Sequence, residues 1–357
     1  MTDPDGAAAL RCPVSLRFST LAAMLNAELA NHPVYDGFEL QWFDDDAHGT
    51  GMLAFLSRRD SRSVDYYAHP GLRLDPRGYT LGGGTRSWST TEFEAARLEV
   101  AEDGVAAHVR FTDVDGRLVE IDVDDRDGRA RRRAGFLAPV SAGITEPTAL
   151  LVVWMPGFDL VRRAPGRSPV VRIDGESSAI GALPGARLHR RHLIKYAAPV
   201  CTLELNRDDD VLAASFGDGA PEWAPEGGVQ AVVAANAGHA AAVRFLPPLP
   251  GLGGSYRATS GGTWSIEVDD AGITGGTWSV RPVGAAREVA LQVTQRWRPR
   301  GLPLLMRVVT TVVPVFRRWP TTYAWRCTLT ADGSVTRAGW SRSGSADDAA
   351  YRRATGS

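Results

Sequence analysis

The chain has 357 residues, which is more than one hydrophobic core usually holds, so we expect two domains. Its 40 basic and 41 acidic residues nearly cancel, which excludes the broad basic field that recruits nucleic acid. Three widely separated cysteines, Cys12, Cys201 and Cys327, predict neither a disulfide framework nor a zinc knuckle. The first residues are acidic and lack the features of a signal peptide, so we expect a cytoplasmic protein.

Near the N-terminus, one segment has the spacing of a helix. Its leucine and methionine residues recur at helical intervals: Leu21, Met24, Leu25 and Leu29. Ser19 and Thr20 are suitable N-caps, and the pattern ends before Pro33, because a residue that precedes proline is disfavoured in a helix. We therefore predict a short N-terminal helix within residues 1–32, packed against a sheet.

Strand patterns begin at Tyr35. Residues 38–42 and 51–56 flank the acidic segment 44–49, which we interpret as a hairpin loop; a metal site is the alternative. Further strands are expected at residues 64–68, 85–93 and 95–100.

Three Asp-Gly pairs then follow at intervals of twelve residues: Asp103-Gly104, Asp115-Gly116 and Asp127-Gly128. Asp-Gly suits tight hairpin turns, so this interval predicts an up-and-down antiparallel sheet. Its strands are expected at residues 108–112 and 118–123, with the arginine-rich segment 129–133 as a solvated strand edge. A further Asp-Gly turn is expected at Asp174-Gly175, after a strand at residues 170–173.

The second half opens near Cys201 and contains the pentapeptide Gly-Gly-Thr-Trp-Ser twice, at residues 261–265 and 275–279. With a three-residue loop at 270–272 and Gly272 in the left-handed region, Trp264 is predicted to lie opposite Trp278. Further strands are expected at residues 288–297 and 322–330, followed by a closing strand that ends at Trp340.

These elements predict an all-β fold of two antiparallel β-barrel or sandwich domains. The domains are expected at residues 33–200 and 201–342, with the helix-bearing segment 1–32 in front and a flexible tail at 343–357. Gly82 to Gly84 precede a strand instead of a helix, so they do not form the fingerprint of a nucleotide-binding protein. The sequence motif of serine hydrolases is also absent. We therefore expect no cofactor.

A few side chains are candidates for acid-base chemistry. Tyr67 and His69 share one face of a strand, and Glu92 shares a strand face with Glu94, so crowding would raise one carboxyl pKa. His189 and His192 would point to opposite faces of a strand, which argues against a metal pair and leaves His192 as a proton donor. The alternative for each of these residues is a polar surface position.

Aromatic side chains are the candidates for ligand binding: Trp88, Trp154, Tyr196, Trp264, Trp278 and Trp325. They either fill a barrel core or line an apolar or sugar-binding cavity. The apolar segment 302–319 is bracketed by arginines, among them Arg298 and Arg318. It either contacts a membrane surface or forms a buried crossover between strands.

Tryptophan-bearing strands such as Gly275-Gly276-Thr277-Trp278 and Tyr323-Ala324-Trp325 resemble those of tandem lipocalin-like proteins. That family includes carotenoid 1,2-hydratase (hydroxyneurosporene synthase) and tocopherol cyclase, and the resemblance spans about residues 35–342. It implies two lipocalin-like barrels that bind an isoprenoid, lipid or polyketide. It also implies cofactor-independent hydration, isomerisation or cyclisation, and it assigns no catalytic residue by motif.

We therefore expect a protein that binds a hydrophobic small molecule in a β-barrel, with acid-base catalysis as one option. One alternative is a non-catalytic lipid-binding module at the inner membrane face, docked through residues 302–319. The other is a carbohydrate-active or carbohydrate-binding β-sandwich, which would need exposed, coplanar tryptophans.

Overall fold

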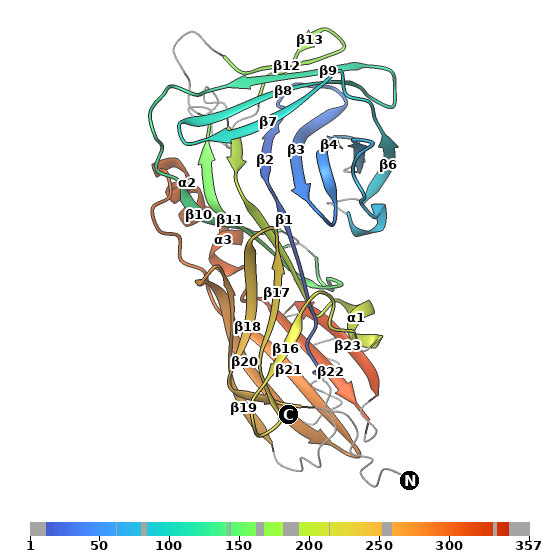
Figure 1. Cartoon of the computed structure of the whole chain (residues 1–357), viewed down its shortest axis with the longest axis vertical. Helices are drawn as coiled ribbons and strands as arrows, with labels where there is room; N and C mark the ends of the chain where they lie inside the picture. The colour runs from blue at the N-terminus through green and yellow to red at the C-terminus, as the bar shows by residue number, and fades with distance from the viewer. Residues whose placement is uncertain are drawn as a thin grey trace.

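The computed structural model describes residues 12–61, 63–79, 84–140, 142, 144–161, 168–180, 193–213, 215–251, 259–330 and 334–342. With 59% strand and 7% helix, the chain has an all-β, two-domain fold built on two curled half-barrel sheets, as predicted. Figure 1 shows the first domain above the second, with the long axis of the molecule running through both.

The first domain contains two sheets. The larger one has ten strands, in the spatial order β1 (Leu16–Leu21), β15 (Val200–Leu205), β11 (Leu150–Leu160), β14 (Ile194–Ala197), β2 (Ala23–Glu28), β3 (Tyr35–Asp45), β4 (Gly49–Arg58), β5 (Val64–Ala68) and β6 (Thr85–Thr90), with β10 (Ala134–Ala138) paired to β11. The smaller one packs over it and has the order β13 (Glu176–Ser177), β12 (Val170–Ile173), β9 (Leu118–Asp124), β8 (Gly104–Thr112) and β7 (Ala95–Ala101).

The second domain is a single sheet in which each strand pairs with the next along the chain. Its strands are β16 (Ala220–Trp223), β17 (Gly228–Asn236), β18 (His239–Pro250), β19 (Ser260–Val268), β20 (Ala271–Val283), β21 (Ala286–Gln295), β22 (Tyr323–Leu329) and β23 (Val335–Arg342). The helical elements in the described part of the chain are η1 (Pro76–Gly78), α1 (Asp208–Leu212), α2 (Leu304–Val312) and α3 (Pro314–Arg318).

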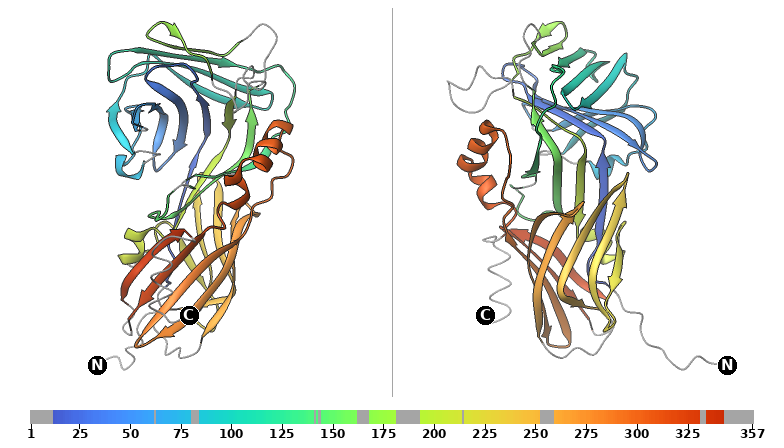
Figure 2. Two further views of the ribbon diagram at one scale, coloured as in Figure 1. Left: turned by 180° about the vertical axis from the view of Figure 1, so that it is seen from behind. Right: turned by 60° about the vertical axis from the view of Figure 1, so that its left-hand side comes forward.

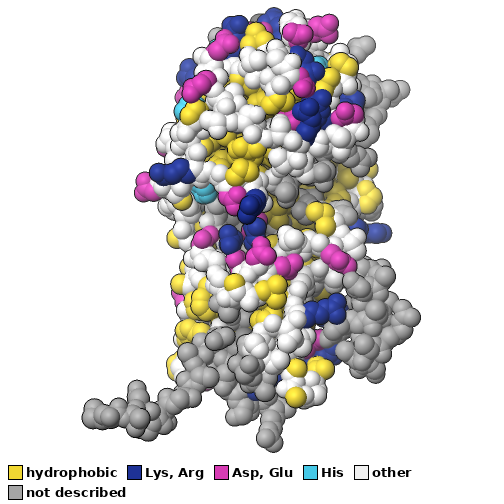
Figure 3. Space-filling view, turned by 90° about the vertical axis from the view of Figure 1, so that its right-hand side faces the viewer, with side chains coloured by type: hydrophobic (Ala, Val, Ile, Leu, Met, Phe, Trp, Pro, Cys, Tyr) yellow, Lys and Arg dark blue, Asp and Glu magenta, His cyan; other side chains and the backbone are white. Residues whose placement is uncertain are grey.

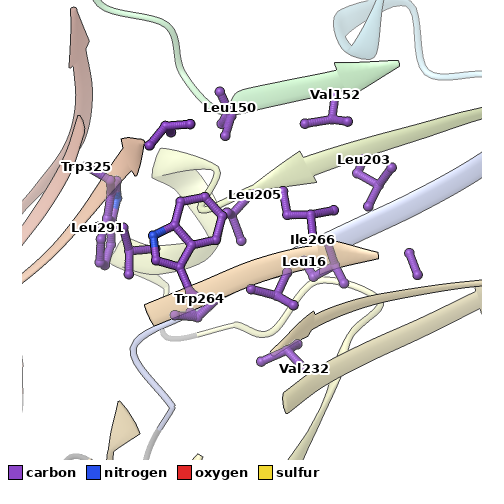
Figure 4. Close-up of a cluster of buried hydrophobic side chains, with 14 of the residues drawn as sticks. Leu16, Leu150, Val152, Leu203, Leu205, Val232, Trp264, Ile266, Leu291 and Trp325 are labelled. Atoms are coloured by element: carbon purple, nitrogen blue, oxygen red, sulfur yellow. The ribbon is translucent and has the colours of Figure 1, made fainter. Parts of the chain in front are cut away.

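Three extended segments run through both domains: β1 followed by β2, β14 followed by β15, and β11. Their lower parts contribute side chains such as Leu16, Val152 and Leu203 to the core of the second domain, opposite Trp264 and Trp325 (Figure 4). Their upper parts belong to the first-domain cores. The core of the second domain is therefore closed by strands of the ten-stranded sheet.

The predicted N-terminal helix is wrong, because residues 16–28 form β1 and β2. In β2 the neighbouring side chains of Met24 and Leu25 are both buried, in two clusters on opposite faces of the sheet. A strand buried on both faces shows no alternation of polar and apolar residues, so its leucines can match a helical spacing by coincidence.

The Asp-Gly interval is confirmed for two of its three turns. Asp103 lies in the turn between β7 and β8, with Gly104 as the first residue of β8, and Asp115-Gly116 lies in the turn between β8 and β9, with Gly116 at a φ of 83°. The third pair begins the crossover from β9 to β10 in the other sheet. Residues 129–133 are therefore not a strand edge, and the Arg131 side chain is only 3% exposed because it is paired with Asp125.

Other local predictions were confirmed. Asp174 and Gly175, with φ of 55° and 78°, form the turn between β12 and β13, and the acidic segment 44–49 connects β3 to β4 as a hairpin. One pairing departs from the antiparallel pattern: β5 and β6 are parallel. Parallel neighbours need a long connection, which residues 69–84 supply.

The repeated pentapeptide pairs with itself, but not tryptophan to tryptophan. Thr263 lies opposite Thr277, so Trp264 faces Gly276 and Trp278 faces Gly262. The turn is formed by Asp269 and Asp270, with φ of 46° and 64°, and the predicted loop at 270–272 is wrong. Aspartate tolerates the left-handed region, so no glycine is required there.

Each indole thus lies across from a residue without a side chain. A Cβ on Gly262 would come within 2.7 Å of Trp278 Nε1, and a Cβ on Gly276 would overlap the carbonyl oxygen of Gln292 on β21. Trp264 donates from its indole Nε1 to the carbonyl oxygen of Thr277 at 3.1 Å. The motif therefore determines how closely the neighbouring strands approach and where the two tryptophan side chains lie.

Gly276→Ala should lower the free energy of unfolding by about 3 kcal/mol, since the new methyl group overlaps backbone atoms. Gly272→Ala on the same strand is the matched control, because its Cβ would meet open space and its backbone is not left-handed. The control should change stability by less than about 1 kcal/mol in urea unfolding. A large loss in Gly272→Ala would instead support the three-residue loop.

Leu203→Ala should destabilise both domains together. Leu203 is fully buried in the segment that the two domains share, and its truncation should cost about 2–4 kcal/mol. We expect a single cooperative unfolding transition that moves to lower urea as a whole. Two separated transitions, with only one displaced, would contradict the coupling.

Candidate functional site

A row of six side chains crosses six strands on one face of the ten-stranded sheet. Strand register places its members opposite one another, from β14 through β2, β3, β4 and β5 to β6: Lys195, Asn26, Glu39, Phe55, Tyr66 and Trp88. We call this surface the Glu39 face. It lies opposite the face that packs against the five-stranded sheet, because Leu25, Leu40 and Tyr67 point the other way.

Glu39 is the polar centre of this face. Its carboxylate accepts hydrogen bonds from Asn26 Nδ2 at 3.0 Å and from Gln41 Nε2 at 2.7 Å. The surrounding side chains on the same face are apolar, among them Met24 and Leu53. Glu39 keeps some exposed surface. Loss of hydration nevertheless raises its pKa, and the hydrogen bonds from the two amides and the charge of Lys195 partly oppose this shift.

Two hydrogen-bond acceptors beside Glu39 lack a partner. The side-chain oxygens of Asn26 and Gln41 are buried, and no described residue donates to either. Gln41 itself is only 9% exposed. Because buried polar atoms are nearly always hydrogen-bonded in folded proteins, these oxygens mark a place for a donor from water or from a ligand.

The other end of the row is aromatic. Phe55 and Tyr66 have ring centroids 5.3 Å apart, and Tyr66 and Trp88 stack at 5.0 Å with 27° between their planes. Tyr79, from the β5–β6 connection, packs on Trp88 at 5.8 Å. Trp88 and Tyr79 both keep part of their surface exposed. We call Phe55, Tyr66, Tyr79 and Trp88 the aromatic wall.

At the opposite end, Lys195 is bound in an ion pair. Its Nζ lies 2.6 Å from Glu28 Oε1, and its side chain is partly exposed. This lysine therefore sits at the charged margin of the Glu39 face.

Tyr67 and His69 lie on the other side of the sheet from the aromatic wall. Tyr67 is completely buried, and its hydroxyl accepts a hydrogen bond from the Val114 amide at 3.4 Å. A line of rings, Tyr67, Phe111, Phe93 and His69, connects the two residues. His69 follows the end of β5, and its Nδ1 accepts from the Gly71 amide at 3.1 Å.

Glu92 is exposed in the connection that follows β6, which ends at Thr90. The expected strand at residues 85–93 is thus shorter, and Glu92 and Glu94 share no strand face; Glu94 pairs with Arg110 at 3.0 Å. Within the described residues, no hydrogen bond joins Tyr67, His69 and Glu92 to one another. His189 and His192 lie outside the described residues.

Tyr196 belongs to a buried ionic cluster on the face opposite Glu39. Its hydroxyl donates to Asp159 Oδ2 at 3.2 Å and lies 3.4 Å from Arg131, which is paired with Asp125 at 2.5 Å. Burial and the neighbouring carboxylates raise the pKa of Tyr196 to about 12. Through Arg131, these contacts connect the crossover from β9 to β10 with β14.

The remaining predicted ligand-binding tryptophans are core residues. Trp154, Trp264, Trp278 and Trp325 are all buried in the core of the second domain. Trp154 packs edge-on against Trp297 at 5.9 Å. Trp88 is therefore the predicted aromatic that lies on the Glu39 face.

Asn26, Glu39 and Gln41 were missed by the sequence analysis. Glu39 and Gln41 alternate with the buried residues Phe38 and Leu40 in a long strand, and that alternation was the available signal. Asn26 was missed because its segment was predicted to be a helix, whereas it forms β2.

No family model matches the chain, and searches of characterised proteins and of solved structures also found no match. In the described part of the chain, no group of three or more His, Cys, Asp or Glu side chains is arranged to hold a metal ion. The helices within the same residues are all too short or too polar to span a bilayer.

Glu39→Gln should alter how stability depends on pH. Because burial raises the pKa of Glu39, the folded chain holds this proton more tightly than the unfolded chain does. The ordinary pKa of a glutamate is 4.5. As the pH rises from this value through the raised pKa of Glu39, the wild-type protein should lose stability relative to the variant. Urea unfolding across this range measures the difference.

The control is Glu92→Gln, at an exposed glutamate. A difference between wild type and Glu39→Gln that stays constant at every pH would show that folding leaves the proton affinity of Glu39 unchanged.

Proposed function

We propose that the first domain binds a hydrophobic small molecule on the Glu39 face. The apolar part of the ligand packs against the aromatic wall, and a hydroxyl group or similar donor reaches Asn26 and Gln41. The observation that carries this proposal is the pair of buried amide oxygens without a partner among the described residues, beside a carboxyl group on a face that also carries the aromatic wall. Apolar pockets with a few convergent polar groups are typical of small-molecule sites.

The charge of the site selects among ligands. A carboxyl group with a raised pKa is poorly hydrated, and an anionic head group beside it would add a second charge to the same surroundings. An alcohol instead donates to the amide oxygens and brings no charge. An isoprenoid or lipid alcohol therefore fits better than the corresponding acid, in keeping with the resemblance to tandem lipocalin-like proteins. A peripheral position at the inner membrane face, where such molecules are found, belongs to the same proposal.

Acid-base catalysis is the second candidate function. A carboxyl group whose pKa is raised by an apolar environment is suited to donate a proton to an alkene or carbonyl group. In this case Glu39 would be the acid, and the ligand would be recovered as a hydrated, isomerised or cyclised product. Recovery of the ligand unchanged after long incubation would leave binding as the function.

The carbohydrate alternative has less support. A sugar platform needs exposed indoles, and Trp264, Trp278 and Trp325 are buried in the second-domain core.

Binding can be tested with farnesol as the probe and farnesoic acid as its charged counterpart, by titration calorimetry. Farnesol should bind more tightly than the acid, and Trp88→Ala should weaken farnesol binding about tenfold. Glu39→Leu should weaken it by a similar factor, because it removes the polar group. Trp223→Ala, at a partly exposed tryptophan on β16, is the control and should bind normally.

Native mass spectrometry of protein purified gently from its own host tests the same proposal without a chosen probe. An apolar molecule should accompany the wild-type protein and be lost from Trp88→Ala. If the protein carries no such molecule and also fails to bind farnesol, the proposal is wrong.

A further inference from the structure

Helix α2 presents an apolar stripe to solvent. Leu304, Val308 and Val312 are 69%, 49% and 64% exposed, and their spacing of four residues places them along one side of the helix. The other side is already packed, since Met306 and Thr310 are buried. The stripe is therefore an additional apolar surface that the fold of this chain leaves uncovered.

The helix lies at the edge of the molecule and is attached through aromatic contacts of the neighbouring segments of the chain. Figures 1 and 2 show α2 and α3 standing outside the sheets, beside β10 and β11. Phe316 of α3 and Trp297 both pack on Phe136 of β10, at 5.8 and 5.9 Å. This attachment fixes the direction in which the stripe faces.

The segment around α2 is purely cationic. Residues 289–331 contain seven arginines and no aspartate or glutamate. Arg296, Arg298, Arg300 and Arg307 are all exposed. On the side of the molecule away from α2, acidic and basic side chains are instead interleaved (Figure 3).

Two of these arginines line a cleft at the end of β21. The cleft has a volume of about 700 Å³ and is lined by Thr294, Gln295, Arg296 and Arg298. Guanidinium groups with a neighbouring hydroxyl and amide are suitable donors for phosphate oxygens. The cleft and the stripe lie on either side of Arg300, within one short stretch of chain.

We propose that α2 and the arginines near it form a docking surface for an anionic phospholipid bilayer. The stripe enters the boundary between head groups and acyl chains, and Arg296, Arg298 and Arg300 contact lipid phosphates. An exposed aliphatic stripe in a segment whose charged residues are all arginines is complementary to such a surface, whereas a neutral membrane or a polar protein would match only half of it. This proposal does not rest on ligand binding at the Glu39 face.

Vesicle cosedimentation tests the proposal. The probes are vesicles of phosphatidylcholine alone and vesicles in which about one third of the lipid is phosphatidylglycerol. The wild-type protein should bind the anionic vesicles at least tenfold more tightly than the neutral ones, and high salt should weaken this binding because it screens the arginines.

Val308→Asp should reduce binding to anionic vesicles at least tenfold, since it places a negative charge in the stripe. Arg298→Ala should reduce it severalfold. Leu212→Asp is the matched control, at a leucine of α1 that is 57% exposed and lies on the other side of the molecule (Figure 1). It should bind as the wild type does, and farnesol binding should be unchanged in all three variants.

Unchanged unfolding curves would show that the variants are folded, as expected at exposed positions. The proposal is overturned if the wild-type protein does not bind anionic vesicles, or if Val308→Asp binds them as tightly as the wild type does. It is also overturned if the wild-type protein binds no vesicles but forms a dimer that Val308→Asp dissociates, because the stripe would then be an interface between two copies.

Discussion

The structure depends on three extended segments that take part in both domains at once. In the segment formed by β14 and β15, Tyr196 lies in a core of the first domain and Leu203 in the core of the second. Backbone hydrogen bonds continue along these segments, so a rotation between the domains would break a sheet instead of bending a linker. The same segments carry β2, and β3 pairs with β2, so the position of Glu39 is fixed by contacts that reach the second domain.

Features that depend on local chain geometry could be predicted from sequence. The turn at Asp174-Gly175 and the consecutive strands of the second domain are examples, because turn chemistry and alternation act over a few residues. The helix predicted near Leu25 failed for a reason that is not local. Leu25 and Met24 of β2 are buried in two different clusters made by distant parts of the chain, and no residue within β2 identifies those partners.

The site was harder to predict than the fold, because it is a line across six strands. Its members are distant in sequence, and they meet only when five strand registers are correct. Glu39 and Gln41 carried a readable signal in their own strand, but their partner Asn26 did not. Tyr67 and Tyr66 illustrate the sensitivity: both rings are buried, but one step along β5 moves the ring from the cluster under the five-stranded sheet to the aromatic wall on the other face.

The self-pairing of the Gly-Gly-Thr-Trp-Ser repeat has an evolutionary consequence. Because Trp264 faces Gly276 and Trp278 faces Gly262, the two copies form two separate couples of one large and one small residue. Each glycine is also required by a neighbouring strand, since a Cβ on Gly276 would overlap the Gln292 carbonyl oxygen and a Cβ on Gly262 would overlap that of Leu246. Across divergent relatives, Gly276 and Gly262 should therefore be retained even where the tryptophan across from them has been replaced by a smaller residue.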